Sequence, residues 1–362
     1  MKHLILLGGG HAHVHVLRAL ATQALPPTRV TLVSPFPRQL YSGMVPGLVA
    51  GHYVVGDCVI PLPPLASKAH AAFIESSATA IDAKSRSVML ASGEVLNYDV
   101  LSIDIGPVMD RDAIVGAREH ALFVRPIEHF ILLSESLLAL ALQRSLSVVV
   151  IGAGAAGVEL AMALQFRLGE QARVSVVTGG PPVLPTHPPS VQARALKALK
   201  RRGITVLEDS CTEIAAGHVL LGSGARLACD APVLCIGTSA PTWLAGSGLA
   251  LDDRGFVATR ATLQSTSHPE VFAAGDVASR EDALHPKSGV YAVRAGPALA
   301  LNLRRFLAGG AVQPHLPAPR SLNLLTCGER YAIASWGEWS MQGRWVWWWK
   351  DRIDRGFVAT YR

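Results

Sequence analysis

The sequence predicts an α/β fold with two doubly wound parallel sheets and a small C-terminal α+β cap. Two observations carry this prediction. A glycine-rich motif occurs twice, 144 residues apart (Gly8 to Gly152), and each copy stands between a short apolar strand and a helical stretch. Each half also contains an apolar strand with the pattern Asp-x6–7-Gly, at 99–106 and 230–237. The chain therefore reads as an internal duplication of one strand–helix–strand unit.

The glycines of these motifs have a physical purpose. The first motif contains Gly8, Gly9 and Gly10, and the second contains Gly152, Gly154 and Gly157. Without a Cβ, the first glycine can turn sharply and the second lets the backbone approach a pyrophosphate closely. The N–H groups of the following helix then face the anion. Two such motifs predict two Rossmann-like domains that hold two dinucleotides face to face.

Composition sets further limits. The chain has 362 residues, of which 50% are hydrophobic and 17% charged, and its net charge is +6. No uninterrupted apolar run reaches the roughly 20 residues of a membrane-spanning helix, and the run after Lys2 ends at Gly8, as a first strand would. Five cysteines without a CxxC pair suit a reducing compartment. We expect a cytoplasmic protein, and the lack of an aromatic–basic motif argues against nucleic acid as a partner.

The remaining elements follow from hydrophobic periodicity. In the first half we expect strands at 4–7 and 30–33, a helix at about 14–24, a Pro- and Gly-rich loop at 35–64, and alternating stretches at 73–81 and 87–90. In the second half we expect helices at about 127–143, 157–167 and 190–202 and strands at 147–151, 173–177 and 205–207. A helix at about 290–307 and a Pro-rich linker at 308–319 complete the chain before the tail.

The tail contains six of the seven tryptophans, between Trp336 and Trp349, together with Arg344, Lys350, Arg352 and Arg355. We expect a strand at 331–336, a turn at Gln342-Gly343 and a helix at 345–361. Tryptophans with flanking cations suit a membrane interface. Trp347, Trp348 and Trp349 nevertheless occupy almost the whole circumference of a helix, which suits a packed cap or a homodimer contact. Both interpretations stay open.

Together these motifs resemble the pyridine-nucleotide-dependent flavoproteins with two dinucleotide-binding domains, the pyridine nucleotide-disulfide oxidoreductase superfamily. Within it, the chain is similar to the type II NADH dehydrogenase branch. Segments 8–13, 41–47 and 345–354 resemble a subgroup of NADH-dehydrogenase-like flavoproteins associated with selenide, water dikinase. The resemblance implies a glutathione-reductase-like FAD/NAD(P) fold. Its predicted parts are a discontinuous FAD domain (1–108 and 245–308), an inserted NAD(P) domain (109–244) and a C-terminal cap, membrane segment or dimer interface (309–362).

The resemblance also implies roles for individual residues. FAD would lie on the first glycine turn and NAD(P)H on the second. Asp276 would hydrogen-bond the FAD ribityl chain, because a carboxylate accepts two hydroxyl donors, and Ala78 would meet the adenine through its backbone. The helix that begins near Val290 would point its positive end at the flavin, with Lys287 just before it. Glu159 would orient the nicotinamide amide against the flavin.

The predicted catalytic residues are therefore Glu159 and Lys287. The predicted cofactor-binding residues are Gly8, Gly9, Gly10, His11, Ala12, His13, Ser34, Arg38, Tyr41, Ser42, Pro46, Ala78, Gly106, Gly152, Gly154, Gly157, Thr178, Gly237, Gly275, Asp276, Gly289 and Val290. His11, His13 and His15 alternate, but His11 and His13 replace motif positions and no partner has metal-ligand spacing, so we predict cofactor lining and no metal site.

Three features depart from the family pattern. His13 replaces the glycine that normally lets helix and strand pack closely, so we expect this helix to lie slightly farther out. Ser34 and Thr178 replace the acidic residues that bind an adenosine ribose, which leaves NADH and NADPH equally open. The segment Tyr41–Gly51 lacks the cysteine pair of the disulfide reductases, which excludes a dithiol relay there.

The expected activity is hydride transfer from NAD(P)H to FAD, followed by transfer of two electrons to an acceptor, for which we expect a quinone. If the tail binds lipid, the protein is peripheral on the cytoplasmic face of the inner membrane. Two alternatives remain. Pro286–Gly289 resembles a segment of sulfide:quinone oxidoreductases, which need cysteines beside the flavin, and only Cys327 is arguably placed for that. The other alternative is a redox sensor that binds FAD and NAD(P)H but turns over slowly.

Overall fold

The computed structural model describes residues 1–23, 25–283, 287–317 and 320–362. Ala24, Pro286 and the end of the predicted linker (318–319) lie outside these described residues. A five-stranded parallel sheet forms the first unit, in the order β19-β9-β1-β2-β5. Its strands are β1 (Lys2–Leu7), β2 (Thr28–Ser34), β5 (Ala72–Glu75), β9 (Val100–Ile103) and β19 (Val271–Ala273). The fifth strand thus comes from far along the chain and completes the sheet beside β9.

The second unit repeats this plan. Its parallel sheet has the order β10-β17-β11-β12-β13. The strands are β10 (Leu122–Phe123), β11 (Leu146–Ile151), β12 (Ala172–Val177), β13 (Thr205–Leu207) and β17 (Ala231–Leu234). In both units the strand before the glycine motif lies at the centre, with the next strand of the chain on one side and the Asp-x6–7-Gly strand on the other. The predicted duplication and the fold class are confirmed.

Each unit also has a three-stranded antiparallel sheet. The first comprises β6 (Ala78–Asp82), β7 (Ser87–Leu90) and β8 (Val95–Asn97), and the second β14 (Cys211–Ala215), β15 (His218–Leu221) and β16 (Arg226–Ala228). A two-stranded sheet pairs β18 (Val257–Thr259) with β20 (Ala278–Arg280). Short helices elsewhere are α5 (Ala117–His120), η2 (Gly169–Gln171), η3 (Thr242–Gly246) and η4 (Gly275–Val277).

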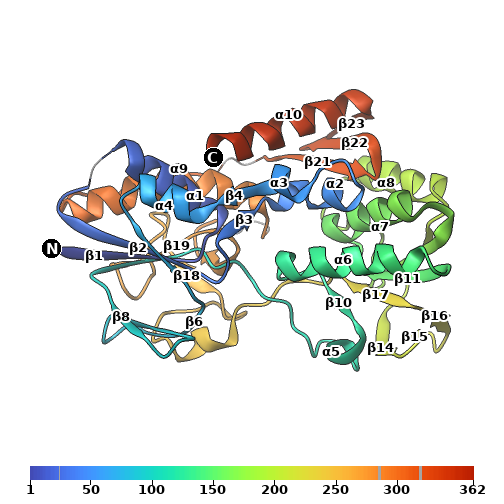
Figure 1. Cartoon of the computed structure of the whole chain (residues 1–362), viewed down its shortest axis with the longest axis horizontal. Coiled ribbons are helices and arrows are strands. Elements are labelled where there is room, and N and C mark those ends of the chain that lie inside the picture. Colours follow the sequence, from blue (N-terminus) through green and yellow to red (C-terminus); the bar gives the residue numbers. More distant parts are fainter. Residues whose placement is uncertain (24, 284–286, 318–319) are drawn as a thin grey trace.

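The long helices follow the predicted apolar periodicity. They are α1 (His11–Thr22), α6 (Ile127–Ala141), α7 (Ala155–Leu168), α8 (Pro189–Arg201) and α9 (Gly289–Leu307). Helices α1 and α9 pack so closely that a Cβ at Gly296 would lie 2.7 Å from the Cβ of His15. Figure 1 shows the first unit on the left and the second on the right, with α6 and α7 over the sheet of the second unit.

The segment 35–64, expected to be a loop, is largely regular. It contains β3 (Arg38–Leu40), η1 (Ser42–Met44), α2 (Val45–Val49), α3 (Val55–Cys58) and β4 (Val59–Pro61), and α4 (Leu62–Lys68) begins at its end. The expectation was wrong because burial overrides the Pro and Gly content. Met44, Ile60 and Leu62 are fully buried, and their tertiary contacts hold elements too short to be stable alone.

The tail is an antiparallel sheet covered by a helix, as the predicted cap required. The strands β21 (Leu322–Cys327), β22 (Glu329–Trp336) and β23 (Trp339–Gly343) precede α10 (Arg344–Thr360). The turn predicted at Gln342-Gly343 is wrong, because the hairpin turns at Gly337-Glu338, where Trp336 pairs with Trp339. Gly337 has a φ of +56°, which glycine adopts at little cost.

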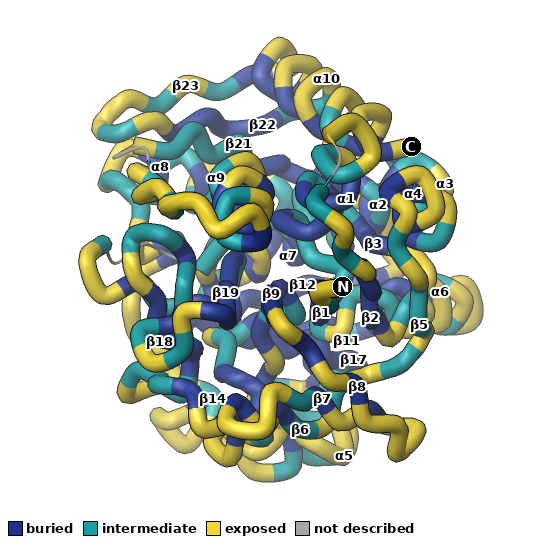
Figure 2. Tube along the Cα trace, turned by 90° about the vertical axis from the view of Figure 1, so that its left-hand side faces the viewer, coloured by how far each residue is buried: buried dark blue, intermediate teal, exposed yellow. Residues whose placement is uncertain are grey.

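Helix α10 lies across the top of the molecule, above the short helices of segment 45–58 (Figure 1). Figure 2 shows its inner side and the central sheets buried and its outer side exposed. Its contact with the first unit includes a buried ion pair. The Lys350 ammonium lies 2.7 Å from the Asp354 carboxylate and donates to the Gly43 carbonyl at 2.8 Å. The Tyr41 hydroxyl also hydrogen-bonds Asp354. Each charge of the pair is thus neutralised by a partner inside the interface.

Removing one member of this pair should destabilise the fold strongly. The substitution Lys350→Met leaves the Asp354 carboxylate buried and unpaired, and we expect a loss of about 3–5 kcal/mol in the free energy of unfolding. Urea denaturation followed by circular dichroism measures it. The double variant Lys350→Met/Asp354→Leu should recover part of the loss, because no unpaired charge remains. Arg118→Ala, which breaks the exposed pair with Asp112, should leave stability unchanged. If Lys350→Met lowered the free energy of unfolding as little as Arg118→Ala does, the buried pair would not stabilise the fold as described.

Candidate functional site

A cavity of about 490 Å³ lies at the carboxyl ends of the first sheet and opens toward the second unit. Such strand ends are where doubly wound folds bind ligands. The structure brings eleven of the predicted residues together on its wall: Gly8, Gly9, Gly10, His11, Ser34, Arg38, Ser42, Ala78, Gly106, Asp276 and Gly289. Residues of the segments that connect the two sheets complete the wall, among them Met109, Arg111, Arg125 and Trp243.

The glycine turn forms the floor of the cavity where β1 ends. Gly8 has a φ of +98°, and its N–H donates to the Val33 carbonyl at 2.8 Å. A Cβ at Gly8 or Gly9 would overlap the Asp104 carbonyl or the Leu62 side chain, respectively. The backbone itself therefore forms the surface here, which lets a ligand phosphate approach the start of α1.

Asp104 is a site residue that the sequence analysis did not single out. It follows β9, and its carboxylate accepts the N–H groups of Ala12 at 2.8 Å and His13 at 3.0 Å. It lies on the cavity wall and is 3% exposed. The pKa of Asp104 is raised to about 7. Burial is the main cause and the nearby charge of Asp276 adds to it, while the two N–H bonds act in the opposite direction. Asp104 lies inside the segment 99–106, but the acid of its Asp-x6–7-Gly pattern is Asp99, so the pattern did not mark Asp104.

The two motif histidines have different positions. His13 is buried: its Nδ1 lies 2.6 Å from the Gly8 carbonyl and its Nε2 2.8 Å from the Ser102 hydroxyl, so it bridges α1 and β9. His11 faces the cavity, with its Nε2 3.5 Å from the Ser42 hydroxyl. Burial lowers the pKa of both imidazoles to about 4. Both are therefore neutral near pH 7. The expectation that His13 sets the helix farther out stays a prediction.

The opposite end of the cavity carries charge. The Arg125 guanidinium lies 3.7 Å from the Asp276 carboxylate, and both line the wall. Arg125 was not predicted as a site residue, because nothing in its local sequence marks it. The first turn of α9 begins beside them at Gly289, where a Cβ would lie 3.1 Å from the Ser42 hydroxyl oxygen. The helix directs its positive end into this part of the cavity.

Other predicted residues are held by partners. Arg38 on the wall forms a bidentate pair with Glu128, through Nε at 3.0 Å and Nη2 at 2.6 Å. The Ser34 hydroxyl donates to the Phe36 carbonyl at 3.0 Å. Tyr41 stands behind the wall and stacks on Phe357, with ring centroids 4.5 Å apart. Ala12, His13, Pro46, Gly275 and Val290 are likewise outside the wall.

The second motif has the same geometry in the second unit. Gly152 has a φ of +109°, and a Cβ at Gly157 would overlap the Gly152 carbonyl. Gly154 and Gly237 have open space beside them. The buried Thr178 hydroxyl has no hydrogen-bond partner among the described residues, at the position predicted to meet a ribose. These residues lie apart from the first cavity.

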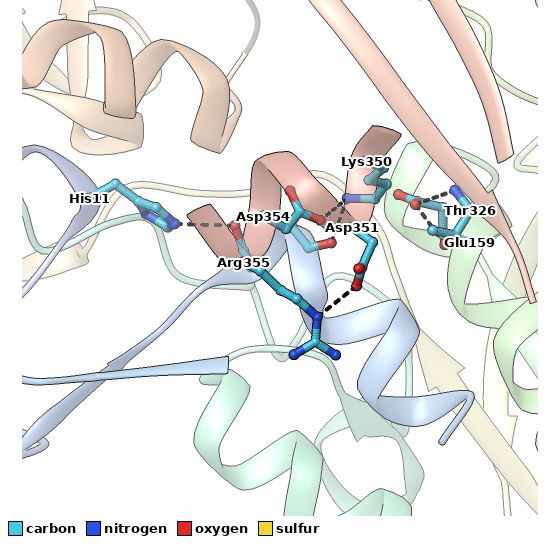
Figure 3. Close-up of polar contacts among 9 residues, drawn as sticks. His11, Glu159, Thr326, Lys350, Asp351, Asp354 and Arg355 are labelled. Carbon is cyan, nitrogen blue, oxygen red and sulfur yellow. Dashed lines mark hydrogen bonds and ion pairs between the residues drawn. The ribbon is translucent and has the colours of Figure 1, made fainter. Parts of the chain in front are cut away.

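Glu159 lies between the second unit and the tail. Its carboxylate accepts the Thr326 N–H at 2.7 Å and the Thr326 hydroxyl at 2.9 Å (Figure 3). Burial raises the pKa of Glu159, and the Lys350 charge opposes that shift. Lys287, the other predicted catalytic residue, is not brought to the cavity wall. Its ammonium donates to the Ala278 carbonyl and lies 4.0 Å from the centre of the Phe256 ring.

These features fit a flavin dinucleotide in the first cavity. The floor is a glycine backbone with no room for a Cβ, one end reaches Ser34 and Ala78, and the other reaches Asp276 and the start of α9. That sequence of groups suits an adenosine, a pyrophosphate and a ring system in turn. Among the described residues, no group of three or more His, Cys, Asp or Glu side chains is placed to hold a metal ion.

Two parallel-sheet units, each with a glycine turn after its central strand, define a dinucleotide-dependent oxidoreductase. The chain belongs to the pyridine nucleotide-disulphide oxidoreductase family, whose model matches residues 2–296. It is therefore an oxidoreductase that uses FAD and NAD(P)H.

Named relatives agree with this assignment. Demethylphylloquinone reductase of Synechocystis is 27% identical over 348 residues, which are 92% of this chain and 86% of the relative. An NADH dehydrogenase-like protein of Mycobacterium tuberculosis is 31% identical over 235 residues, 61% of this chain and 59% of that protein.

Solved structures share the whole fold. The sulfide:quinone oxidoreductase of Aquifex aeolicus superposes with a TM-score of 0.85 and 20% identity, over 100% of this chain and 92% of that one. NDH2 of Plasmodium falciparum in complex with NADH gives a TM-score of 0.82 and 14% identity, over 99% and 97%.

The glycine turn gives a direct prediction about cofactor content. Gly10→Ala places a Cβ on the Asp104 carboxylate, so we expect the purified variant to hold less than about a tenth of the FAD of the wild type. The ratio of flavin to protein absorbance measures this. Gly56→Ala is the matched control, because a Cβ at Gly56 meets nothing within 4 Å. Full FAD content in Gly10→Ala would show that the cofactor does not use this turn.

Proposed function

We propose that the protein passes reducing equivalents from NAD(P)H through FAD to a quinone. One observation carries the proposal: the chain has two nucleotide-binding sheets, each with its own glycine turn, and the cavity beside the first turn is walled partly by residues that lead into the second unit, such as Arg111 and Arg125. We infer that nucleotides on the two turns bring their reactive ends together there. The quinone reductase among the relatives and the quinone oxidoreductase among the similar structures support the choice of acceptor.

The bound flavin supplies the chemistry of hydride acceptance and electron release, and the chain supplies positioning. Gly8, Gly9 and Gly10 give the FAD pyrophosphate access to the start of α1. Asp276 accepts the ribityl hydroxyls, and Arg125 balances its charge.

The second unit positions the nicotinamide nucleotide. Gly152, Gly154 and Gly157 receive its pyrophosphate, and the unpartnered Thr178 hydroxyl is available to its ribose. Glu159 is fixed by its two bonds from Thr326, so its carboxylate has a defined direction for a nicotinamide amide. Lys287 is engaged with Ala278 and Phe256, which favours a role in shaping the loop before α9.

We also propose that the tail binds the surface of an anionic membrane. Its aromatic surface consists of exposed side chains of β22, β23 and α10: Trp336, Trp339, Met341, Trp345, Trp348, Trp349 and Ile353. Arg344 and Arg352 are exposed beside it, and tryptophans with cations suit the interface of a bilayer. Trp347 is buried against Tyr53 and His52 instead, which separates the packed side of α10 from the exposed side.

This placement would bring the protein to a lipid-soluble quinone on the cytoplasmic face of the inner membrane. Among the described residues, no helix is long and apolar enough to cross a bilayer. A homodimer through the same aromatic surface is the competing arrangement, and the membrane test below distinguishes the two.

The sulfide alternative has weaker support. Cys327 is buried in β21, is not on the cavity wall, and burial raises the pKa of its thiol to about 12. The thiol is therefore protonated near neutral pH and is a poor nucleophile. A slow redox sensor remains the other alternative, and turnover separates it from an enzyme. The association of the subgroup with selenide, water dikinase stays a prediction from the motifs.

Anaerobic stopped-flow absorbance tests the proposed activity. NADH or NADPH should bleach the bound flavin, and a soluble quinone added afterwards should restore its absorbance. Bleaching without recovery would remove the quinone from the proposal. Bleaching by sulfide and by neither nicotinamide would support the sulfide alternative instead.

Glu159→Gln should slow flavin bleaching by about 10²-fold, because the nicotinamide loses a positioning contact, while the FAD content stays that of the wild type. The same stopped-flow traces give the rate. Thr326→Val is the matched control: it removes one of the two bonds to Glu159 and should have a smaller effect. Equal rates in Glu159→Gln and the wild type would exclude Glu159 from this role.

The aromatic surface predicts binding to vesicles. The variant Trp339→Ala/Trp345→Ala/Trp348→Ala should bind vesicles that contain anionic phospholipid at least about tenfold more weakly than the wild type, because it loses interfacial rings. Cosedimentation measures this, and Leu132→Ala/Leu142→Ala, which removes exposed apolar side chains on α6 and directly after it, is the control. Unchanged vesicle binding together with a dimer-to-monomer shift in sedimentation velocity would support the homodimer instead.

A further inference from the structure

The Asp104 carboxylate lies between the two turns that face the first cavity. A Cβ at Gly10 would overlap this carboxylate, and a Cβ at Gly275 would lie 2.6 Å from its Oδ1. Asp104 Oδ2 meanwhile accepts two N–H groups of the first turn of α1. The carboxyl group therefore lies where the pyrophosphate-facing turn and the turn that carries Asp276 meet.

A second acid lies in the same place. The charge of Asp276 acts on Asp104 directly, and the FAD pyrophosphate adds two negative charges at the start of α1. The neighbouring histidines do not offset them, because His11 and His13 are neutral near pH 7. Of the cations on this wall, Arg125 already pairs with Asp276, Arg38 pairs with Glu128, and Arg111 lies over the Phe123 ring. An ionised Asp104 would thus share the positive end of α1 with a like-charged ligand, which disfavours the charged form.

We propose that Asp104 holds FAD in its protonated form, so that FAD binding takes up one proton wherever the free chain carries the carboxylate. In this binding reaction, the ionised carboxyl group, FAD and one proton from solvent give the neutral carboxylic acid and bound FAD. One carboxyl oxygen still accepts the N–H bonds of α1, and the O–H lies on the other. Asp104 is then a positioning residue for the cofactor, and this inference rests on the FAD site proposed above.

The pH window follows from the burial of the group. In the free chain the pKa of Asp104 is about 7, so the group is mostly ionised at about pH 8 and mostly protonated at about pH 6. FAD raises that pKa further. FAD affinity should therefore be highest below about pH 7 and should fall by up to about tenfold for each pH unit above it.

Isothermal titration calorimetry of the full chain, freed of flavin and titrated with FAD, tests this in two buffers of different ionisation enthalpy. We expect uptake of about one proton at about pH 8 and little at about pH 6. Asp104→Asn keeps an oxygen for the N–H bonds and cannot ionise, so it should bind FAD without proton uptake at either pH. His218→Gln, which replaces a histidine of β15 in the second unit, is the control and should leave the uptake unchanged.

Three results would overturn the inference: no uptake by the wild type at about pH 8, uptake that persists in Asp104→Asn, or uptake that disappears in His218→Gln. If Asp104→Asn does not fold, the wild-type difference between the two pH values still decides. A chain that does not bind FAD at all would instead contradict the cofactor site, so the two failures are distinguishable.

Discussion

The Asp104 carboxylate connects the parts on which the rest of the site depends. It caps the first turn of α1 through the N–H groups of Ala12 and His13, and it fixes how closely the turns at Gly10 and Gly275 can approach. Because β9 delivers Asp104 between β1 and β19, the order of strands in the first sheet determines where a cofactor can lie.

The tail joins the two units. Thr326 of β21 binds Glu159 on α7 of the second unit (Figure 3), whereas Lys350 of α10 binds Gly43 of the first unit. The tail therefore contacts both nucleotide-binding units, and its helix contains a buried ion pair. The spacing between the two glycine turns, on which any transfer between their ligands depends, is set in part by a segment outside both sheets.

Much of the fold could be predicted from the sequence, because local rules govern it. The glycine motifs predicted both central strands and the helices after them, and apolar periodicity located α6, α8 and α9. Segment 35–64 and strands β21 and β23 were missed, because their stability comes from tertiary burial. The misplaced turn has a similar cause. Gln342-Gly343 has the local sequence of a turn, but Trp336 pairs with Trp339, so the chain turns at Gly337-Glu338 between them.

The site was predictable where a motif names the residue, and less so where only the fold brings groups together. Gly8, Asp276 and Ala78 come from motifs or from the family resemblance and lie on one wall. Asp104 and Arg125 come from separate segments of the chain. Only the fold brings Asp104 to the start of α1 and Arg125 to Asp276, so the sequence alone did not mark them. Lys287 illustrates the reverse: its position before α9 suggested the flavin, but its ammonium has nearer partners.

A crystal structure of the protein with FAD and NAD(P)⁺ bound would test the central claim most directly. The account predicts the FAD pyrophosphate against Gly8, Gly9 and Gly10, and the nicotinamide nucleotide against Gly152 and Gly154. The two ring systems should meet where the first cavity opens toward the second unit. FAD on the second turn, or both nucleotides in one unit, would contradict the account.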